Sequence, residues 1–191
     1  MGNITLVFTW IIFLAFSEIS LIIWQNFKKY SENAKNEGKP FLNRSIAGLF
    51  PLGSTYKMVA AVAGLEEGLI TAKTSINCEG IYEYYTDYTP VCFNSTAHGK
   101  VTVQTALKHS CNVFFYDTGR QLGIDTLNYY AKMLGFGQKL GIELPGERAG
   151  IVAGREYRES KGQTWAPQET LTAVIGQSDN SNPGVIPSNA Y

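Results

Sequence analysis

The 191-residue sequence lacks a charge excess, internal repeats and low-complexity tracts, and it has few histidines and cysteines. Its 16 basic and 16 acidic residues cancel, which excludes a strongly basic surface, so we expect no nucleic-acid partner. The two histidines have no cysteine or carboxylate cluster at ligand spacing, so we expect no metal site and no cofactor. Plentiful aromatic residues argue against disorder, and the length fits one domain of ~100–200 residues.

Ser54 and Lys57 are three residues apart at the start of an apolar segment, after a turn marked by Pro51 and Gly53. Residues i and i+3 share a helix face, so the Lys57 amine can reach the Ser54 hydroxyl. A serine hydroxyl needs a neighbouring base to act as a nucleophile, and partial burial of the lysine keeps some amine neutral. The pattern therefore predicts Ser54 as nucleophile and Lys57 as base. The alternative is that Ser54 is a helix N-cap and Lys57 points into water.

A second polar group, Ser110-Cys111-Asn112, interrupts two apolar helical segments. A short break there would expose a hydroxyl and a carboxamide toward a cleft. Ser110 can relay a proton between Lys57 and a leaving amine, and Asn112 can bind a substrate amide and hold Lys57. The alternative is that Ser110 and Asn112 are helix caps.

Four strings extend the pattern beyond single motifs: FLNRSIAGLFPLGSTYKMVAAVAGLEEG, ALKHSCNVFFYDTG, LGFGQKLGIELPGERAGIVAG and WAPQETLTAVIGQSDN. With them the sequence resembles the transpeptidase domain of class B penicillin-binding proteins of the elongation type, whose relatives share Ser-x-x-Lys, Ser-x-Asn and Lys-Thr-Gly elements. The resemblance implies that Ser54 is the acylated nucleophile and Lys57 its base. It also implies that Ser110 is the proton relay and Asn112 a substrate ligand. Gly176 and Gln177 match a family element near the active site, to which we assign no chemical role.

The resemblance runs from about Pro40 to Asn180 and implies an α+β fold, the penicillin-binding transpeptidase fold. The family's Lys-Thr-Gly strand, which lends a backbone N–H to the oxyanion hole, has no counterpart before Tyr191. The nearest string, Lys161-Gly162-Gln163, has the wrong order and is expected to be a loop. The strands that precede the nucleophile helix are not recognisable either. We expect an incomplete, mostly helical fold without much of the central sheet. Since loss of one oxyanion donor costs ~10²–10³ in turnover, we also expect weak or no activity from this chain alone.

For a complete domain, the resemblance implies a D,D-transpeptidase that cross-links peptidoglycan. Ser54 would attack the carbonyl of a D-alanyl-D-alanine stem peptide, and β-lactams would acylate the same residue. A cell-wall glycosyltransferase is the further partner that the resemblance implies. Two other classes stay open: a β-lactam-binding sensor or impaired remnant, and a small helical membrane protein without catalysis.

The sequence divides into three parts: residues 1–30, a membrane anchor or a segment foreign to the family; residues 31–40, a polar linker; and residues 41–191, a partial transpeptidase domain. Residues 4–23 are almost wholly apolar and long enough to cross a bilayer of ~30 Å. The resemblance implies location at the bacterial cell membrane with the catalytic part on the extracytoplasmic side.

The flanking charges argue differently about this apolar segment. Glu18 is its only charge, no basic residue precedes it, and Lys28 and Lys29 follow it. The positive-inside rule would then place the catalytic part in the cytoplasm. A buried core segment, and residues supplied by a rearranged reading frame, are the other interpretations.

Cys78 and Cys92 bracket a Tyr-rich loop. A disulfide between them would staple this loop in an oxidising compartment, and two free thiols are the alternative. Cys111 lies inside the active-site string, but His109 points elsewhere on a helix, so Cys111 is expected to pack in the core. His98 is expected in a turn.

Three helices are expected after residue 100, over residues 101–108, 112–122 and 125–134. Thr102 would cap the first, and Gly123 and Gly135 would end the other two. Ile142 and Leu144 suggest a short strand before a Pro-Gly turn.

Overall fold

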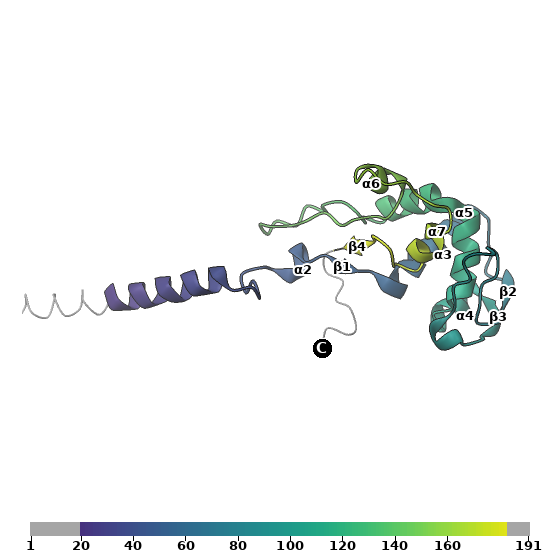
Figure 1. Ribbon diagram of the computed structural model, residues 1–191, viewed down its shortest axis with the longest axis horizontal. Helices are drawn as coiled ribbons and strands as arrows, with labels where there is room; N and C mark the ends of the chain where they lie inside the picture. The colour runs from purple at the N-terminus through teal and green to yellow at the C-terminus, as the bar shows by residue number, and fades with distance from the viewer. Residues whose placement is uncertain (1–19, 183–191) are drawn as a thin grey trace, which may run out of the picture. The chain divides into compact units, whose positions relative to one another are not determined.

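The computed structural model describes residues 20–182 and divides the chain into two compact units, residues 1–43 and 44–191 (Figure 1). In the first unit the described helix runs through residues 20–35, so it includes the first half of the expected polar linker. The Tyr30 ring stacks on Phe41 with 4.9 Å between ring centroids. Within residues 20–182 we find no helix with the length and apolarity needed to span a bilayer. Most of the apolar segment at residues 4–23 lies outside the described residues.

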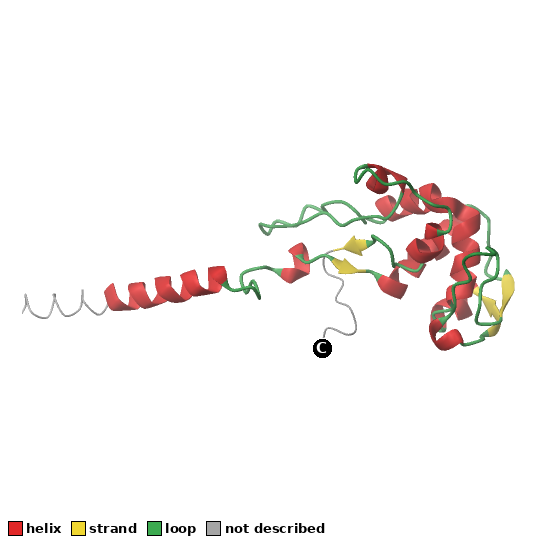
Figure 2. Cartoon of the chain, in the orientation of Figure 1, coloured by secondary structure: helices red, strands yellow, loops and turns green. Residues whose placement is uncertain are grey.

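The second unit is mostly helical, with two small antiparallel sheets (Figure 2). One sheet pairs β1 (Phe50–Pro51) with β4 (Ser181–Asn182), and the other pairs β2 (Ser75–Cys78) with β3 (Gly99–Thr102). The expected α+β architecture, with a helical part and little sheet, is confirmed. Its elements, in chain order, are α2 (Arg44–Ala47), β1 (Phe50–Pro51), the 3₁₀ turn η1 (Gly53–Tyr56), α3 (Lys57–Glu66), β2 (Ser75–Cys78), the 3₁₀ turn η2 (Phe93–Ser95), β3 (Gly99–Thr102), α4 (Val103–Lys108), α5 (Asn112–Met133), α6 (Arg155–Glu159), α7 (Glu169–Val174) and β4 (Ser181–Asn182).

The main core forms where α5 packs between α3 and α7. Small residues bring these helices together: a Cβ on Gly119 of α5 would lie 2.6 Å from Val174 of α7, and one on Gly64 of α3 would lie 3.1 Å from Thr118. Phe114 and Phe115, at the start of α5, are fully buried. The first turns of α3 and α5, which carry the two sequence motifs, are therefore fixed against one another by burial of apolar surface.

The helix predictions hold, with one change of boundary. α5 has non-helical dihedral angles at Gly123, where φ is 76°, so its two halves correspond to the two expected helices. Thr102 caps α4 through a capping box with Thr105. Val101 and Thr102 belong to β3 rather than to the helix, because they pair with Ile76 and Ser75 of β2.

The expected strand around Ile142 and Leu144 is wrong. The backbone N–H groups of Leu140 and Ile142 donate to the carboxylate of Glu147 at 2.6 and 3.1 Å, and this side chain takes the place of a neighbouring strand. The apolar side chains of this loop are exposed. The string at 161–163 lies in a turn and a loop, as expected.

Candidate active site

Ser54 lies in the 3₁₀ turn that leads into α3, and Lys57 is the first residue of that helix. Gly53 opens the turn with φ of 53°, a left-handed conformation that favours glycine. Side chains at i and i+3 eclipse one another in a 3₁₀ turn, so both residues face the same side. Ser54 is exposed, whereas Lys57 is only 1% exposed. The turn thus presents a hydroxyl above a buried amine.

Ser110 lies in the break between α4 and α5 and has φ of 52°. A non-glycine residue in this conformation carries a strain of ~1–3 kcal/mol, which the surrounding structure must offset. The N–H of Cys111 donates to the Ala106 carbonyl at 2.8 Å and fixes the turn. The interpretation of Ser110 and Asn112 as helix caps is wrong, because the N-cap of α5 is Cys111 and both side chains point to other partners.

The Lys57 ammonium has three acceptors, one for each of its protons. It donates to the backbone oxygen of Ser110 at 2.7 Å, to Ser110 Oγ at 2.9 Å and to Asn112 Oδ1 at 2.6 Å. It also lies 5.8 Å from the centre of the Phe115 ring. Burial lowers the pKa of Lys57 to about 8. A part of the amine is therefore neutral near neutral pH, which a general base requires.

Ser110 connects Lys57 to Ser54. Its Oγ donates to Ser54 Oγ at 2.9 Å and accepts from Lys57 Nζ at 2.9 Å. Sequence reasoning expected Lys57 to contact Ser54 directly, but the contact in the structure runs through the second serine. All four predicted site residues are brought together, and the second hydroxyl lies in the middle of the chain.

A cavity of about 420 Å³ opens in front of this chain of side chains. Ser54, Ser110 and Asn112 line it, together with His109 and Gln177. Asn112 Nδ2 donates to the Val91 carbonyl at 3.0 Å, and the Asn112 side chain also interacts with Tyr116. The hydroxyl of Ser54 is thus open to a ligand that enters the cavity.

The Gly176-Gln177 element lies beside the nucleophile, where the resemblance placed it. The N–H of Gly53 donates to the Gly176 carbonyl at 2.9 Å. Gln177 is exposed and lines the cavity. This backbone bond joins the end of α7 to the residue that precedes Ser54.

Three cysteines and a histidine form a cluster next to the turn that carries Ser110 and Asn112. Sequence reasoning missed this cluster. Cys78 Sγ is 3.7 Å from Cys92 Sγ and 3.4 Å from His98 Nδ1, and Cys92 Sγ is 3.9 Å from Cys111 Sγ. All four ligand atoms lie within 4.8 Å of one another. The structure therefore corrects the premise that no thiols gather around a histidine.

These distances fit a tetrahedral metal site. With Zn–S of ~2.3 Å and Zn–N of ~2.0–2.1 Å, adjacent ligand atoms of a zinc site are roughly 3.5–3.8 Å apart. All three cysteines are buried and free, so the expected alternative of free thiols holds and the disulfide does not. Burial raises the pKa of the Cys111 thiol, which argues against a nucleophile there. The available sequence signal was weak, because Cys92 follows Cys78 by 14 residues and Cys111 follows Cys92 by 19.

The chain matches the penicillin binding protein transpeptidase domain over residues 18–181. It is 34% identical over 154 residues to the peptidoglycan D,D-transpeptidase MrdA of Acinetobacter baumannii, and 31% identical over 157 residues to MrdA of Escherichia coli. These matches cover 80% and 78% of this chain but 23% and 24% of the relatives. The chain thus spans about a quarter of the length of these curated relatives.

Solved structures show the same similarity. PBP2 of Pseudomonas aeruginosa in complex with WCK 5153 has a TM-score of 0.75 at 35% identity, over 82% of this chain and 36% of that chain. PBP2 of Helicobacter pylori, solved in a complex with MreC, has a TM-score of 0.75 at 30% identity, over 82% and 29%. These similarities confirm the resemblance found in the motifs. The chain belongs to the penicillin-binding protein transpeptidase family, in its PBP2/MrdA-type elongation branch.

Proposed function

We propose that this chain carries the acyl-serine centre of a peptidoglycan D,D-transpeptidase. The observation that supports it best is the hydrogen-bonded chain from Lys57 Nζ through Ser110 Oγ to Ser54 Oγ. These bonds run toward Ser54 while Lys57 is charged; with Lys57 neutral both reverse, and the same chain gives the Ser54 hydroxyl a route for its proton. The comparisons add relatives named as peptidoglycan D,D-transpeptidases, and they give no support to a sensor, a remnant or a membrane protein without catalysis.

In the proposed acylation, neutral Lys57 accepts a proton from Ser110 while Ser110 accepts one from Ser54. Ser54 Oγ then forms a bond to the carbonyl carbon of the penultimate D-alanine. The C–N bond to the terminal D-alanine breaks, and the leaving amine takes the proton back from Lys57 through Ser110. With a pKa of about 8, roughly one-tenth of Lys57 is neutral at pH 7, which is enough for a base.

In the proposed second half-reaction, an amine from a neighbouring stem peptide attacks the ester on Ser54. The same chain removes a proton from this amine and returns one to Ser54 Oγ as the ester bond breaks. Asn112 is the proposed substrate ligand, since it lines the cavity together with Ser54 and Ser110. β-Lactams would acylate Ser54 by the same attack.

The setting of the whole protein is proposed from its relatives. One relative is titled as a PBP2 complex with MreC, and another structure as a peptidoglycan synthase complex that coordinates polymerization and crosslinking. We propose that this protein likewise works at the extracytoplasmic face of the bacterial membrane with a cell-wall glycosyltransferase.

Labelling with a fluorescent penicillin tests the proposal. The chain should form an adduct at Ser54, Ser54→Ala should form none, and Ser160→Ala, which removes an exposed hydroxyl just after α6, should label as the parent does. Slow and stable labelling would favour the sensor alternative. An adduct on Ser54→Ala, or no adduct on folded parent protein, would contradict the proposed nucleophile.

A second proposed function concerns the cysteine and histidine cluster. We propose that Cys78, Cys92, His98 and Cys111 hold a structural Zn²⁺, because three thiols and an imidazole at these distances match the ligand type and geometry that zinc prefers. The ion would join the Tyr-rich loop to the turn that carries Ser110 and Asn112.

Metal content and cobalt substitution test this site. We expect about one zinc per chain, and Co²⁺ in its place should give the visible absorption of a tetrahedral thiolate site. Cys92→Ser should lose both signals, whereas His109→Ala, which removes the ring that stacks on His98, should keep them. A Cys78–Cys92 disulfide in metal-free, folded protein would overturn the proposal.

A further inference from the structure

The turn after α7 is in direct backbone contact with the residue that precedes Ser54. The Gly53 N–H donates to the Gly176 carbonyl. The two backbone segments also approach so closely that a Cβ on Gly176 would lie 2.0 Å from the Gly53 oxygen. Gly176 also has φ of 75°. The position of Ser54 therefore depends on where this turn is held.

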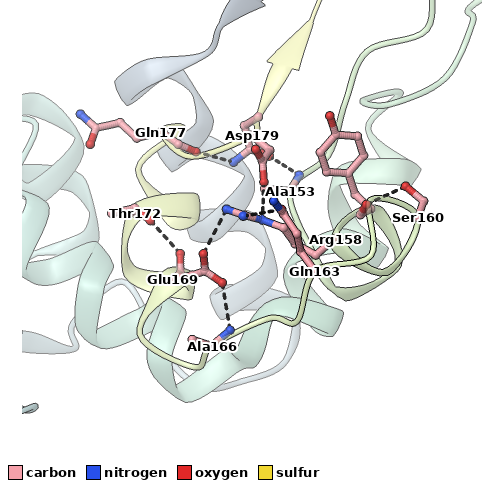
Figure 3. A network of polar contacts seen from close by, with 11 residues as sticks. Ala153, Arg158, Ser160, Gln163, Ala166, Glu169, Thr172, Gln177 and Asp179 are labelled. Carbon is pink, nitrogen blue, oxygen red and sulfur yellow. Dashed lines mark hydrogen bonds and ion pairs between the residues drawn. The ribbon is translucent and has the colours of Figure 1, made fainter.

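The guanidinium group of Arg158 contacts residues at both ends of the segment that contains this turn (Figure 3). Arg158 Nε lies 2.7 Å from Asp179 Oδ2, and Arg158 Nη2 lies 3.0 Å from Glu169 Oε1. Its third nitrogen, Nη1, donates to Gln163 Oε1 at 2.9 Å. Glu169 is the first residue of α7, and Asp179 follows the turn at Gly176. The guanidinium thus bridges two carboxylates, and its contact with Asp179 is a close ion pair without the geometry of a hydrogen bond.

Packing of α7 on α5 and hydrogen bonds at both ends also hold this segment. A helix of six residues such as α7 is marginal by itself and depends on tertiary contacts. The other carboxylate oxygen of Glu169 accepts the N–H of Ala166 at 2.9 Å and so begins the helix. Beyond the turn, the amide of buried Asn180 accepts the Ala153 N–H at 2.8 Å and donates to the Ala173 carbonyl at 2.8 Å. Glu169 takes part in both the first of these contacts and an ion pair with Arg158, and Asn180 directly follows Asp179, so the Arg158 ion pairs lie next to these contacts.

We propose that Arg158 is a positioning residue of the active site. It holds the Gly176-Gln177 turn in the place where the Gly176 carbonyl orients Gly53 and Ser54, and where Gln177 lines the cavity. Its side chain is 21% exposed and it contacts none of the four predicted site residues in the described part of the chain, so it acts through the turn. The catalytic consequence rests on the proposed function, but the effect on the turn does not.

Amide hydrogen exchange tests the effect on the turn without any chemistry. In Arg158→Ala the Gly53 amide should exchange about tenfold faster, because its acceptor is no longer held. The Cys111 amide, bonded to Ala106 in the break before α5, is the internal reference and should not change. Arg155→Ala is the matched control, since Arg155 is on the same helix but pairs with Asp125 at the surface at 3.3 Å. Unchanged exchange at Gly53 in folded Arg158→Ala, or the same increase in Arg155→Ala, would overturn the proposal.

Acylation kinetics test the catalytic consequence. Positioning predicts that Arg158→Ala lowers the first-order acylation constant of Ser54 by about 10- to 100-fold and changes penicillin binding much less. Arg158→Lys, which keeps the charge but loses the fork, should fall between this variant and the parent and protects the test against simple loss of fold. If the parent does not acylate, the proposed function fails while the exchange result still decides the role of Arg158. A folded variant that acylates at the parent rate would contradict positioning.

Discussion

The turn that carries Ser110 and Asn112 separates two buried polar groups. One is the Lys57 amine, and the other is the cluster of three cysteines and His98. On one side, the Lys57 ammonium finds three neutral oxygens within the chain, so its protons are satisfied by the fold itself. On the other side, three thiols and an imidazole converge. Buried polar groups need partners. The first group is complete by folding, whereas the second would be completed by the Zn²⁺ proposed above.

The largest predicted effect comes from removal of the Lys57 amine. Lys57→Met keeps much of the apolar stem and should reduce the rate of Ser54 acylation by ~10³–10⁴, because a positioned base contributes up to that range. The rate of labelling by a fluorescent penicillin measures the effect. Lys108→Met, at an exposed lysine, is the control and should leave the rate unchanged. Acylation of Lys57→Met at the parent rate would show that another group is the base.

Removal of the proposed Zn²⁺ should affect stability rather than the proton route. A chelator should lower the melting temperature of the parent, since a ligand at 100 times its dissociation constant stabilises a fold by about 2.7 kcal/mol. Cys92→Ser should melt at a lower temperature with or without chelator. Thermal unfolding followed by circular dichroism gives both values. If complete metal removal by the chelator left the melting temperature of the parent unchanged, the proposed stabilisation of the cysteine and histidine cluster by a metal would be contradicted.

The pH dependence of acylation sharpens the first half. Burial lowers the pKa of Lys57 to about 8, so the neutral base is the minor form at pH 7 and the major form at pH 9. The acylation rate should therefore rise about tenfold between these values. Asn112→Asp should move the midpoint to higher pH, because a carboxylate beside Lys57 favours its charged form. A rate that falls with pH over this range would contradict neutral Lys57 as base.

The smallest predicted effect concerns α4, the helix that leads into the turn with Ser110 and Asn112. Thr102→Ala removes the cap of α4 and should cost about 1 kcal/mol of unfolding free energy. Chemical denaturation measures this loss. Since the cap touches neither Lys57 nor the cysteines, the acylation rate and the metal content should stay as in the parent. A loss of either would show that the two groups depend on α4 more than on their own contacts.

Features within a few residues of one another were predictable. The i, i+3 spacing of Ser54 and Lys57 placed both on one face, and Thr102 was recognised as a cap, because these relations follow from local helix geometry. The boundary at Val101 was not predictable, since pairing with β2 extends the strand into the expected helix. The strand expected around Ile142 failed for the same reason, because a single carboxylate, Glu147, replaces the partner strand.

By itself, the sequence determined the motifs, most helix positions and the family, because side-chain order and local periodicity carry that information. Only the tertiary structure decided that Ser110 bridges Lys57 and Ser54, that three cysteines meet His98, and that Arg158 grips both ends of the α7 segment. Each of these contacts joins residues from separate elements. Packing of helices and turns, and not the spacing along the chain, sets the distance between such residues.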